Sequence, residues 1–242
     1  MFKKRLTDSM RLIIRFKPLV EFDYYSIDKY DIQGFIYSLL KDSSYDKWHE
    51  NIGFKFFNFS NIFPVTDFNP EEVKTLIVSS PEKELIKTLS KKLKNRDTIK
   101  LSNYSFELIQ VKSIDIKNNP KIIAATPITL FENNKSNKYF SIKKTGDSDF
   151  FFKRLKDNAI KKYNAYYQED YQLEEPIFDM FEYKKEVSIR VTIKHETFIV
   201  IGSLWKFEKD INKSNEKFYK FLFDCGYGEK NSLGMGFVNN WK

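Results

Sequence analysis

The sequence holds one cysteine, Cys225, and two histidines among its 242 residues. A single cysteine excludes an intrachain disulfide, and so few cysteines and histidines argue against a structural zinc site, whose four ligands come mainly from these residues. No run of 18 apolar residues occurs, and the N-terminus lacks the apolar core of a signal peptide. We therefore expect a soluble, cytoplasmic protein with no metal, no cofactor and no membrane partner.

Acidic residues are in the minority, and aromatic residues are abundant. Lys and Arg number 41 against 33 Asp and Glu, which gives a formal net charge of +8 at pH 7. This balance favours a polyanionic partner, because lysine and arginine bind phosphates and release counterions, although many basic proteins bind no nucleic acid. Aromatic residues make up 17% of the chain, and rings outside the core can stack on bases.

The first half of the sequence predicts the order β-α-β-β-α-β. A helix is expected at 31–41 because five apolar residues fall on one helical face: Ile32, Phe35, Ile36, Leu39 and Leu40. Pro81 is expected to open a second helix that ends near Lys94. Strands are predicted at 11–16, 54–59 and 73–80, and the segment 98–116 is β-rich. This order is typical of a ferredoxin-like domain.

The second half repeats the pattern loosely. A strand is expected at 121–131, a long helix at 149–168, a hairpin formed by 187–193 and 197–205, a helix at 214–225 capped by Ser214, and a closing strand around Val238. We therefore predict an α+β protein of two tandem ferredoxin-like domains. The first domain would span residues 1–125 and the second would span 126–242.

Glycine is scarce, yet four of the eight glycines lie in one short stretch: Gly226, Gly228, Gly234 and Gly236. Glycine permits positive φ and a close approach of the backbone to other atoms. A helix C-cap and a tight turn would explain the first pair but explain the second pair poorly. The stretch is neither a Walker loop nor a dinucleotide-binding turn. A loop whose backbone N–H groups face an anion is the remaining interpretation.

The string GYGEKNSLGMGFV resembles the C-terminal glycine-rich loop of the CRISPR-associated endoribonucleases that process precursor CRISPR RNA, within the RAMP superfamily. The segments MRLIIRF, IQGFIYSLL, FKFFNFS and ATPI also lie where the family has counterparts. The resemblance implies tandem ferredoxin-like domains with the loop packed between them and contributing to RNA binding. It implies precursor CRISPR RNA as the partner, with a CRISPR effector complex and a second copy of the chain as further candidates.

RNA cleavage without a metal needs a base, an acid and a cation that stabilises the phosphorane, and histidine suits the proton transfers. His195, in the string KHET, is interpreted as an exposed turn residue. His49, in DKWHENIGFKFF, would also be an ordinary loop residue, and Lys55 an ordinary solvated lysine. Tyr37 lies off the apolar helical face, which favours a site over the core. The resemblance implies that Tyr37, His49 and Lys55 form the catalytic set.

In that set His49 would be the general base or acid, Lys55 the charge stabiliser, and Tyr37 either a positioning residue or a partner in the proton transfer. The products would be a 2′,3′-cyclic phosphate and a 5′-hydroxyl. Predicted RNA contacts outside this set are Gly226, Gly228, Lys230, Asn231, Ser232, Gly234, Gly236, Lys153, Arg154 and Arg190. The helix at 149–168 carries several basic residues, Lys162 among them, and the solvated face of an amphipathic helix explains them equally well.

Two other functions compete with an endoribonuclease. A non-catalytic subunit that binds repeat RNA within an effector complex would use the same fold, but the retention of Tyr37, His49 and Lys55 argues against it. A ferredoxin-like protein that binds a small molecule would not need the basic balance or the glycine-rich stretch.

Overall fold

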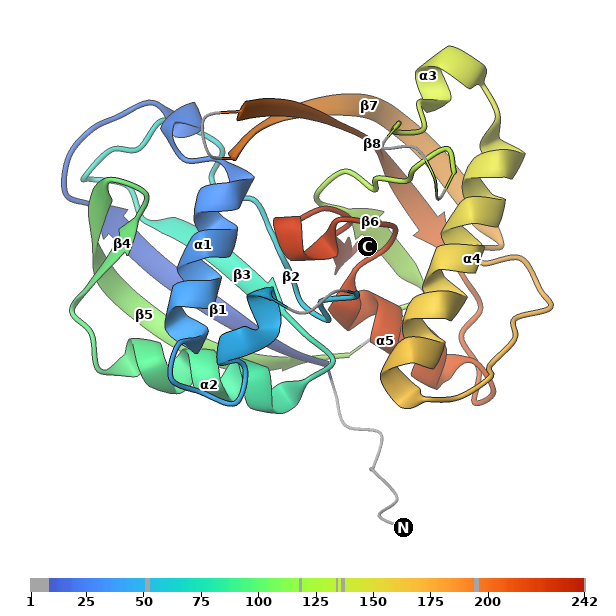
Figure 1. Cartoon of the computed structure of the whole chain (residues 1–242), viewed down its shortest axis with the longest axis horizontal. Helices are drawn as coiled ribbons and strands as arrows, with labels where there is room; N and C mark the ends of the chain where they lie inside the picture. Colours follow the sequence, from blue (N-terminus) through green and yellow to red (C-terminus); the bar gives the residue numbers. More distant parts are fainter. Residues whose placement is uncertain are drawn as a thin grey trace, which may run out of the picture.

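The computed structural model describes residues 9–50, 53–117, 119–133, 135, 138–193 and 196–241, with the backbone alone at Ser9 and His49. Figure 1 shows two α/β halves side by side, with the C-terminal segment lying between them. In the described part of the chain, no helix combines the length and apolarity that crossing a bilayer requires.

The first half forms a five-stranded antiparallel sheet. Its elements are β1 (Ser9–Pro18), α1 (Lys29–Leu40), β2 (Asn58–Phe59), β3 (Lys74–Ser79), α2 (Lys83–Lys94), β4 (Thr98–Leu101) and β5 (Tyr104–Ile116). The strand order is β2-β3-β1-β5-β4. Four of these strands, with β5 as the last, have the ferredoxin-like arrangement, and β4 adds an edge strand through a hairpin with β5. Two 3₁₀ helices, η1 (Tyr24–Ser26) and η2 (Asp46–His49), flank α1.

The second half repeats the arrangement. Its elements are β6 (Lys121–Ala124), α3 (Ile142–Thr145), α4 (Ser148–Tyr167), β7 (Met180–Ile193), β8 (Glu196–Glu208), α5 (Glu216–Cys225), the 3₁₀ helix η3 (Asn231–Leu233) and β9 (Val238–Asn240). The strand order β7-β8-β6-β9 is again ferredoxin-like, which confirms the predicted tandem fold. The division after residue 125 stays a prediction. However, β6 lies before that point and pairs within the second sheet, which favours a division between Ile116 and Lys121.

Each sheet packs its helices over a separate apolar core. The predicted apolar face of α1 is buried in the first core, and Asp28 begins this helix with a capping box that it shares with Asp31. In the second core, Phe151 of α4 stacks on Trp205 of β8 at 4.9 Å between ring centroids. The sequence therefore predicted α1 and its buried face correctly.

Several predicted element boundaries are wrong, and one of them is the end of the strand expected at 121–131, since β6 ends at Ala124. The expected strand at 54–59 shrinks to β2 because Phe56 leaves the first sheet and packs on Tyr166 of α4, with ring centroids 5.0 Å apart. Helix α2 begins at Lys83 after the N-cap residue Glu82 rather than at Pro81. Helix α5 has Asn215 as its N-cap rather than Ser214.

Hydrogen bonds of two serine side chains explain where the helices α2 and α5 begin. Ser80 Oγ accepts a hydrogen bond from the Glu82 backbone N–H, so the turn before α2 is held without helical hydrogen bonds at Pro81. The Ser214 side chain donates to Asn212 rather than capping the helix.

The β7–β8 hairpin is also longer than expected and arches over the C-terminal segment toward α1 (Figure 1). At α1, the Thr192 backbone N–H donates to Asp28 at 2.7 Å.

Candidate functional site

The glycine-rich loop, residues 226–237, is largely buried between the two domains. All four of its glycines are buried and have positive φ. A Cβ on Gly226 would lie 2.0 Å from the Asn58 side-chain nitrogen of the first domain, and one on Gly236 would lie 1.8 Å from the Tyr227 carbonyl oxygen. Only glycine fits such approaches at positive φ. Close approach of the backbone to other protein atoms therefore accounts for the positions of the four glycines.

Lys162 of α4 binds the loop through its ammonium group. Its ammonium donates to the Gly226 carbonyl at 2.6 Å, the Gly228 carbonyl at 2.9 Å and the Asn231 side-chain oxygen at 2.7 Å. The residue is 2% exposed, and burial lowers its pKa. The interpretation of Lys162 as part of a solvated basic face is wrong, because all three of its protons are used inside the protein.

The tip of the loop faces α1. Gln33 donates to the Ser232 carbonyl at 2.8 Å, and the side chains of Tyr37 and Ser232 also share a hydrogen bond. Burial raises the pKa of Tyr37 to about 12, and the hydrogen bond with Ser232 opposes that rise. Tyr37 is half-buried and packs its ring edge-to-face on Phe57 at 5.7 Å. Its hydroxyl therefore stays protonated at neutral pH and can donate a hydrogen bond.

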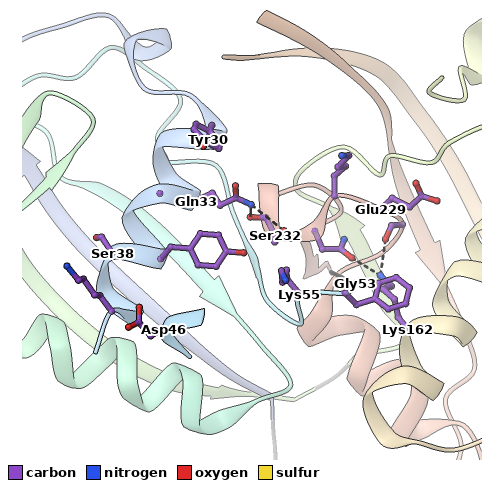
Figure 2. Close-up of a pocket in the computed structure, with 16 residues that line it drawn as sticks. Tyr30, Gln33, Ser38, Asp46, Gly53, Lys55, Lys162, Glu229 and Ser232 are labelled. Carbon is purple, nitrogen blue, oxygen red and sulfur yellow. Dashed lines mark hydrogen bonds between the residues drawn. The ribbon is translucent and has the colours of Figure 1, made fainter. Parts of the chain in front are cut away.

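A cleft of about 780 Å³ lies between α1 and the loop (Figure 2), and we call it the candidate cleft. The residues that line it come from both domains and are Tyr30, Gln33, Gly34, Tyr37, Ser38, Lys41, Asp46, Gly53, Phe54, Lys55, Lys162 and residues 228–232. The Lys55 side chain lies in the middle of this view, and burial lowers its pKa. The structure thus brings two predicted catalytic residues, Tyr37 and Lys55, together with the predicted contacts Lys230 and Ser232.

The third predicted catalytic residue, His49, is described by its backbone alone. It ends η2, and Asp46 at the start of η2 lines the candidate cleft. The His49 side chain lies outside the described structure, so its catalytic role stays a prediction. The whole of His195 lies outside it as well.

Comparisons with known proteins agree with one another. A sequence profile described as CRISPR associated protein Cas6, C-terminal, matches residues 109–240. A curated protein from Methanocaldococcus jannaschii, CRISPR-associated endoribonuclease Cas6 2, is 43% identical over 241 residues, which cover 95% of this chain and 99% of the relative. The chain belongs to the Cas6 family. This membership confirms the resemblance carried by the glycine-rich loop.

More distant Cas6 relatives extend over the same length. A curated CRISPR-associated endoribonuclease Cas6 from Haloferax mediterranei is 23% identical and covers 95% of this chain and 93% of its own. A solved structure named CRISPR associated protein Cas6 is 25% identical with a TM-score of 0.71, covering 97% and 100% of the two chains. Another, an RAMP protein binding different RNA substrates, is 19% identical with a TM-score of 0.72, covering 96% and 100%.

The other predicted RNA contacts of this Cas6 family chain are dispersed. Lys153 is exposed on α4, and Arg154 pairs with Glu229 at 3.6 Å. Arg190 is exposed on β7 and lines a different groove, which runs between β7 and the region of η1. Asn231 is buried, where it accepts from Lys162 and donates to two backbone carbonyls. Whether these residues and the four glycines contact RNA stays a prediction.

Sequence reasoning missed several polar residues of the candidate cleft, Gln33 and Glu229 among them. Gln33 lies four residues before Tyr37 and so shares its helical face, which is a signal that the sequence offers. Glu229 lies between the two glycine pairs, and its carboxylate pKa is raised by burial beside Arg154, which opposes the rise. The sequence analysis expected phosphate-binding cations in the site, and that expectation does not predict the carboxylate of Glu229.

Proposed function

We propose that the protein is an endoribonuclease that cuts repeat RNA within precursor CRISPR transcripts and thereby releases guide RNAs. Support comes from its membership of a family whose curated relatives are named CRISPR-associated endoribonucleases. The observation that carries the proposal is the candidate cleft, where Tyr37 and Lys55 of the first domain share one space with Lys230 and Ser232 of the loop.

The proposed reaction is an internal phosphoryl transfer without a metal ion. The 2′-oxygen of the nucleotide before the cut gives its proton to a base and bonds to the adjacent phosphorus, forming a 2′,3′-cyclic phosphate. The bond from phosphorus to the 5′-oxygen breaks, and an acid protonates that oxygen, leaving a 5′-hydroxyl. A cation stabilises the negative charge of the phosphorane between these steps.

The three assigned residues divide these tasks. His49 carries the proton transfers, since imidazole exchanges protons near neutral pH. Lys55 stabilises the phosphorane, because its side chain enters the candidate cleft and carries the positive charge. Tyr37, with its pKa raised to about 12, positions a phosphate oxygen as a hydrogen-bond donor rather than acting as the base.

The test uses the CRISPR repeat of the source genome as labelled RNA, with EDTA in excess. One cut at a fixed site, ending in a cyclic phosphate and lost in His49→Ala, is expected. His195→Ala is the matched control and keeps the wild-type rate. Cleavage that needs added magnesium would overturn the metal-independent mechanism, and cleavage that survives His49→Ala would overturn the role of His49.

The same experiment addresses the competing function and the partners. Binding of the repeat without cleavage, in both wild type and variants, would favour a non-catalytic RNA-binding subunit. An effector complex and a second copy of the chain stay candidate partners, and light scattering with and without the repeat RNA measures the second of these.

A further inference from the structure

A second hollow adjoins the candidate cleft, and we call it the side hollow. It has a volume of about 590 Å³ and lies between two segments, 131–132 and 138–145, and the strands β7 and β8. Lys230, at the tip of the glycine-rich loop, lines both the side hollow and the candidate cleft. The side hollow and the candidate cleft therefore meet at Lys230.

The side hollow has an apolar floor and aromatic walls. Val191, Val200 and Leu233 form part of the floor and belong to a small buried cluster. On one side, Phe131 and Tyr139 stack at 4.8 Å with an angle of 17° between their planes. Phe198 of β8 also lines the hollow and is 45% exposed, so its ring is accessible to a ligand in the hollow.

Cations surround this apolar interior. Lys138, Lys144 and Lys230 line the hollow, and the Lys230 ammonium lies 5.5 Å from the centre of the Phe131 ring. One carboxylate, Glu132, opposes them and pairs with Lys138 at 2.9 Å. The lining therefore has flat apolar surfaces inside and a net positive charge around them.

We propose that the side hollow holds an unpaired nucleobase of the bound RNA, close to the phosphate that is cut. The proposal rests on the proposed function and adds a site to it. A base presents two flat faces that stack on aromatic rings, while its phosphates need cations, and the hollow offers both. Lys230 moves from the Phe131 ring to a phosphate when the base enters. A protein partner is disfavoured because the hollow shares Lys230 with the cleft that is proposed to hold the RNA.

The test measures stacking directly. Repeat RNA carries a 2′-deoxy group at the nucleotide before the mapped cut, which removes the attacking hydroxyl, and 2-aminopurine at one flanking position at a time. The protein is expected to quench 2-aminopurine fluorescence at one or two positions beside the cut. Phe198→Leu is expected to relieve most of that quenching, and Phe131→Leu provides the second variant. Phe181→Leu is the control variant, because Phe181 is 50% exposed and lines neither the candidate cleft nor the side hollow. It is expected to leave the quenching unchanged.

A second measurement couples protein and RNA. An abasic nucleotide at the quenched position weakens binding to the wild type about tenfold and weakens binding to Phe198→Leu by less than about twofold. Equal weakening for both proteins, or uniform quenching at every flanking position, would overturn the side hollow as a base site while leaving the endoribonuclease intact. Failure to bind the repeat at all would overturn both proposals.

Discussion

Lys162→Met removes the ammonium that holds the glycine-rich loop and replaces it with an apolar chain of similar length. Three charge-assisted hydrogen bonds are lost, at 2.6, 2.9 and 2.7 Å. Their acceptors are buried and would be left without this donor, at a combined cost of about 5 kcal/mol. Burial of the ammonium is itself unfavourable, as the lowered pKa of Lys162 indicates. The variant avoids this cost, which offsets about 2 kcal/mol of the loss.

We therefore expect Lys162→Met to lose about 3 kcal/mol of unfolding free energy. For a chain of this size that loss corresponds to a fall of about 6–12 °C in Tm. The loop also carries Ser232, which bonds Gln33 and Tyr37, so the single-turnover cleavage rate falls as well. Thermal unfolding and a single-turnover assay, performed below the unfolding temperature of the variant, measure the two effects.

The matched control is Lys161→Met. It removes the same charge from the neighbouring residue of α4, whose side chain is exposed. Lys161→Met is expected to change Tm by less than about 2 °C and to leave the cleavage rate unaltered. If Lys162→Met unfolds at the same temperature as Lys161→Met, the three hydrogen bonds contribute little, and the account of how the loop is held is refuted.

Three further substitutions test other parts of the structure. Arg11→Met removes hydrogen bonds from β1 to the C-terminal strand and is expected to cost about 3 kcal/mol in urea unfolding, whereas an unchanged midpoint would contradict the role of Arg11. Gly236→Ala introduces a clash at a φ of 70° and should cost at least about 3 kcal/mol, whereas Gly34→Ala, with nothing within 4 Å, should be neutral or stabilising. Burial lowers the pKa of Lys29 to about 7 from 10.5, so the folded protein carries a buried ammonium below pH 7. Lys29→Met removes this ammonium and is expected to raise the unfolding free energy above that of the wild type. This gain is constant below pH 7 and shrinks by about 1.4 kcal/mol per pH unit above it. A gain that does not change between pH 6 and pH 9 would contradict that pKa.

The elements that the sequence predicted well are those whose pattern is local. The apolar face of α1 follows from the spacing of Ile32, Phe35 and Leu39, and all three are buried in the first core. The glycine-rich loop was recognisable because positive φ and close contact leave a compositional trace. Tyr37 was predicted as a site residue because it lies off the apolar face, and it does line the candidate cleft.

What the sequence could not predict depends on contacts between distant segments. The segment 54–59 has the aromatic alternation of a strand, but Phe56 packs on Tyr166, more than one hundred positions further along the chain. Lys162 looks like any lysine of an amphipathic helix, and only the position of the loop carbonyls makes it buried. A hydrophobic pattern records which side chains avoid water, and it does not record which domain they meet.

The buried glycines also change where RNA contacts should be sought. A loop that cradles phosphate would leave its N–H groups facing solvent, but the Gly226 and Gly236 N–H groups donate to carbonyls of Leu222 and Pro127 inside the protein. The part of the loop that lines the candidate cleft is its tip, residues 228–232, which includes the side chains of Lys230 and Ser232. The close packing of Gly226 against Asn58 and of Gly234 against Phe59 therefore holds the loop against the first domain. It follows that a substitution within the glycine pairs should disturb stability and cleavage together, whereas a substitution at Lys230 should weaken RNA binding and leave stability intact.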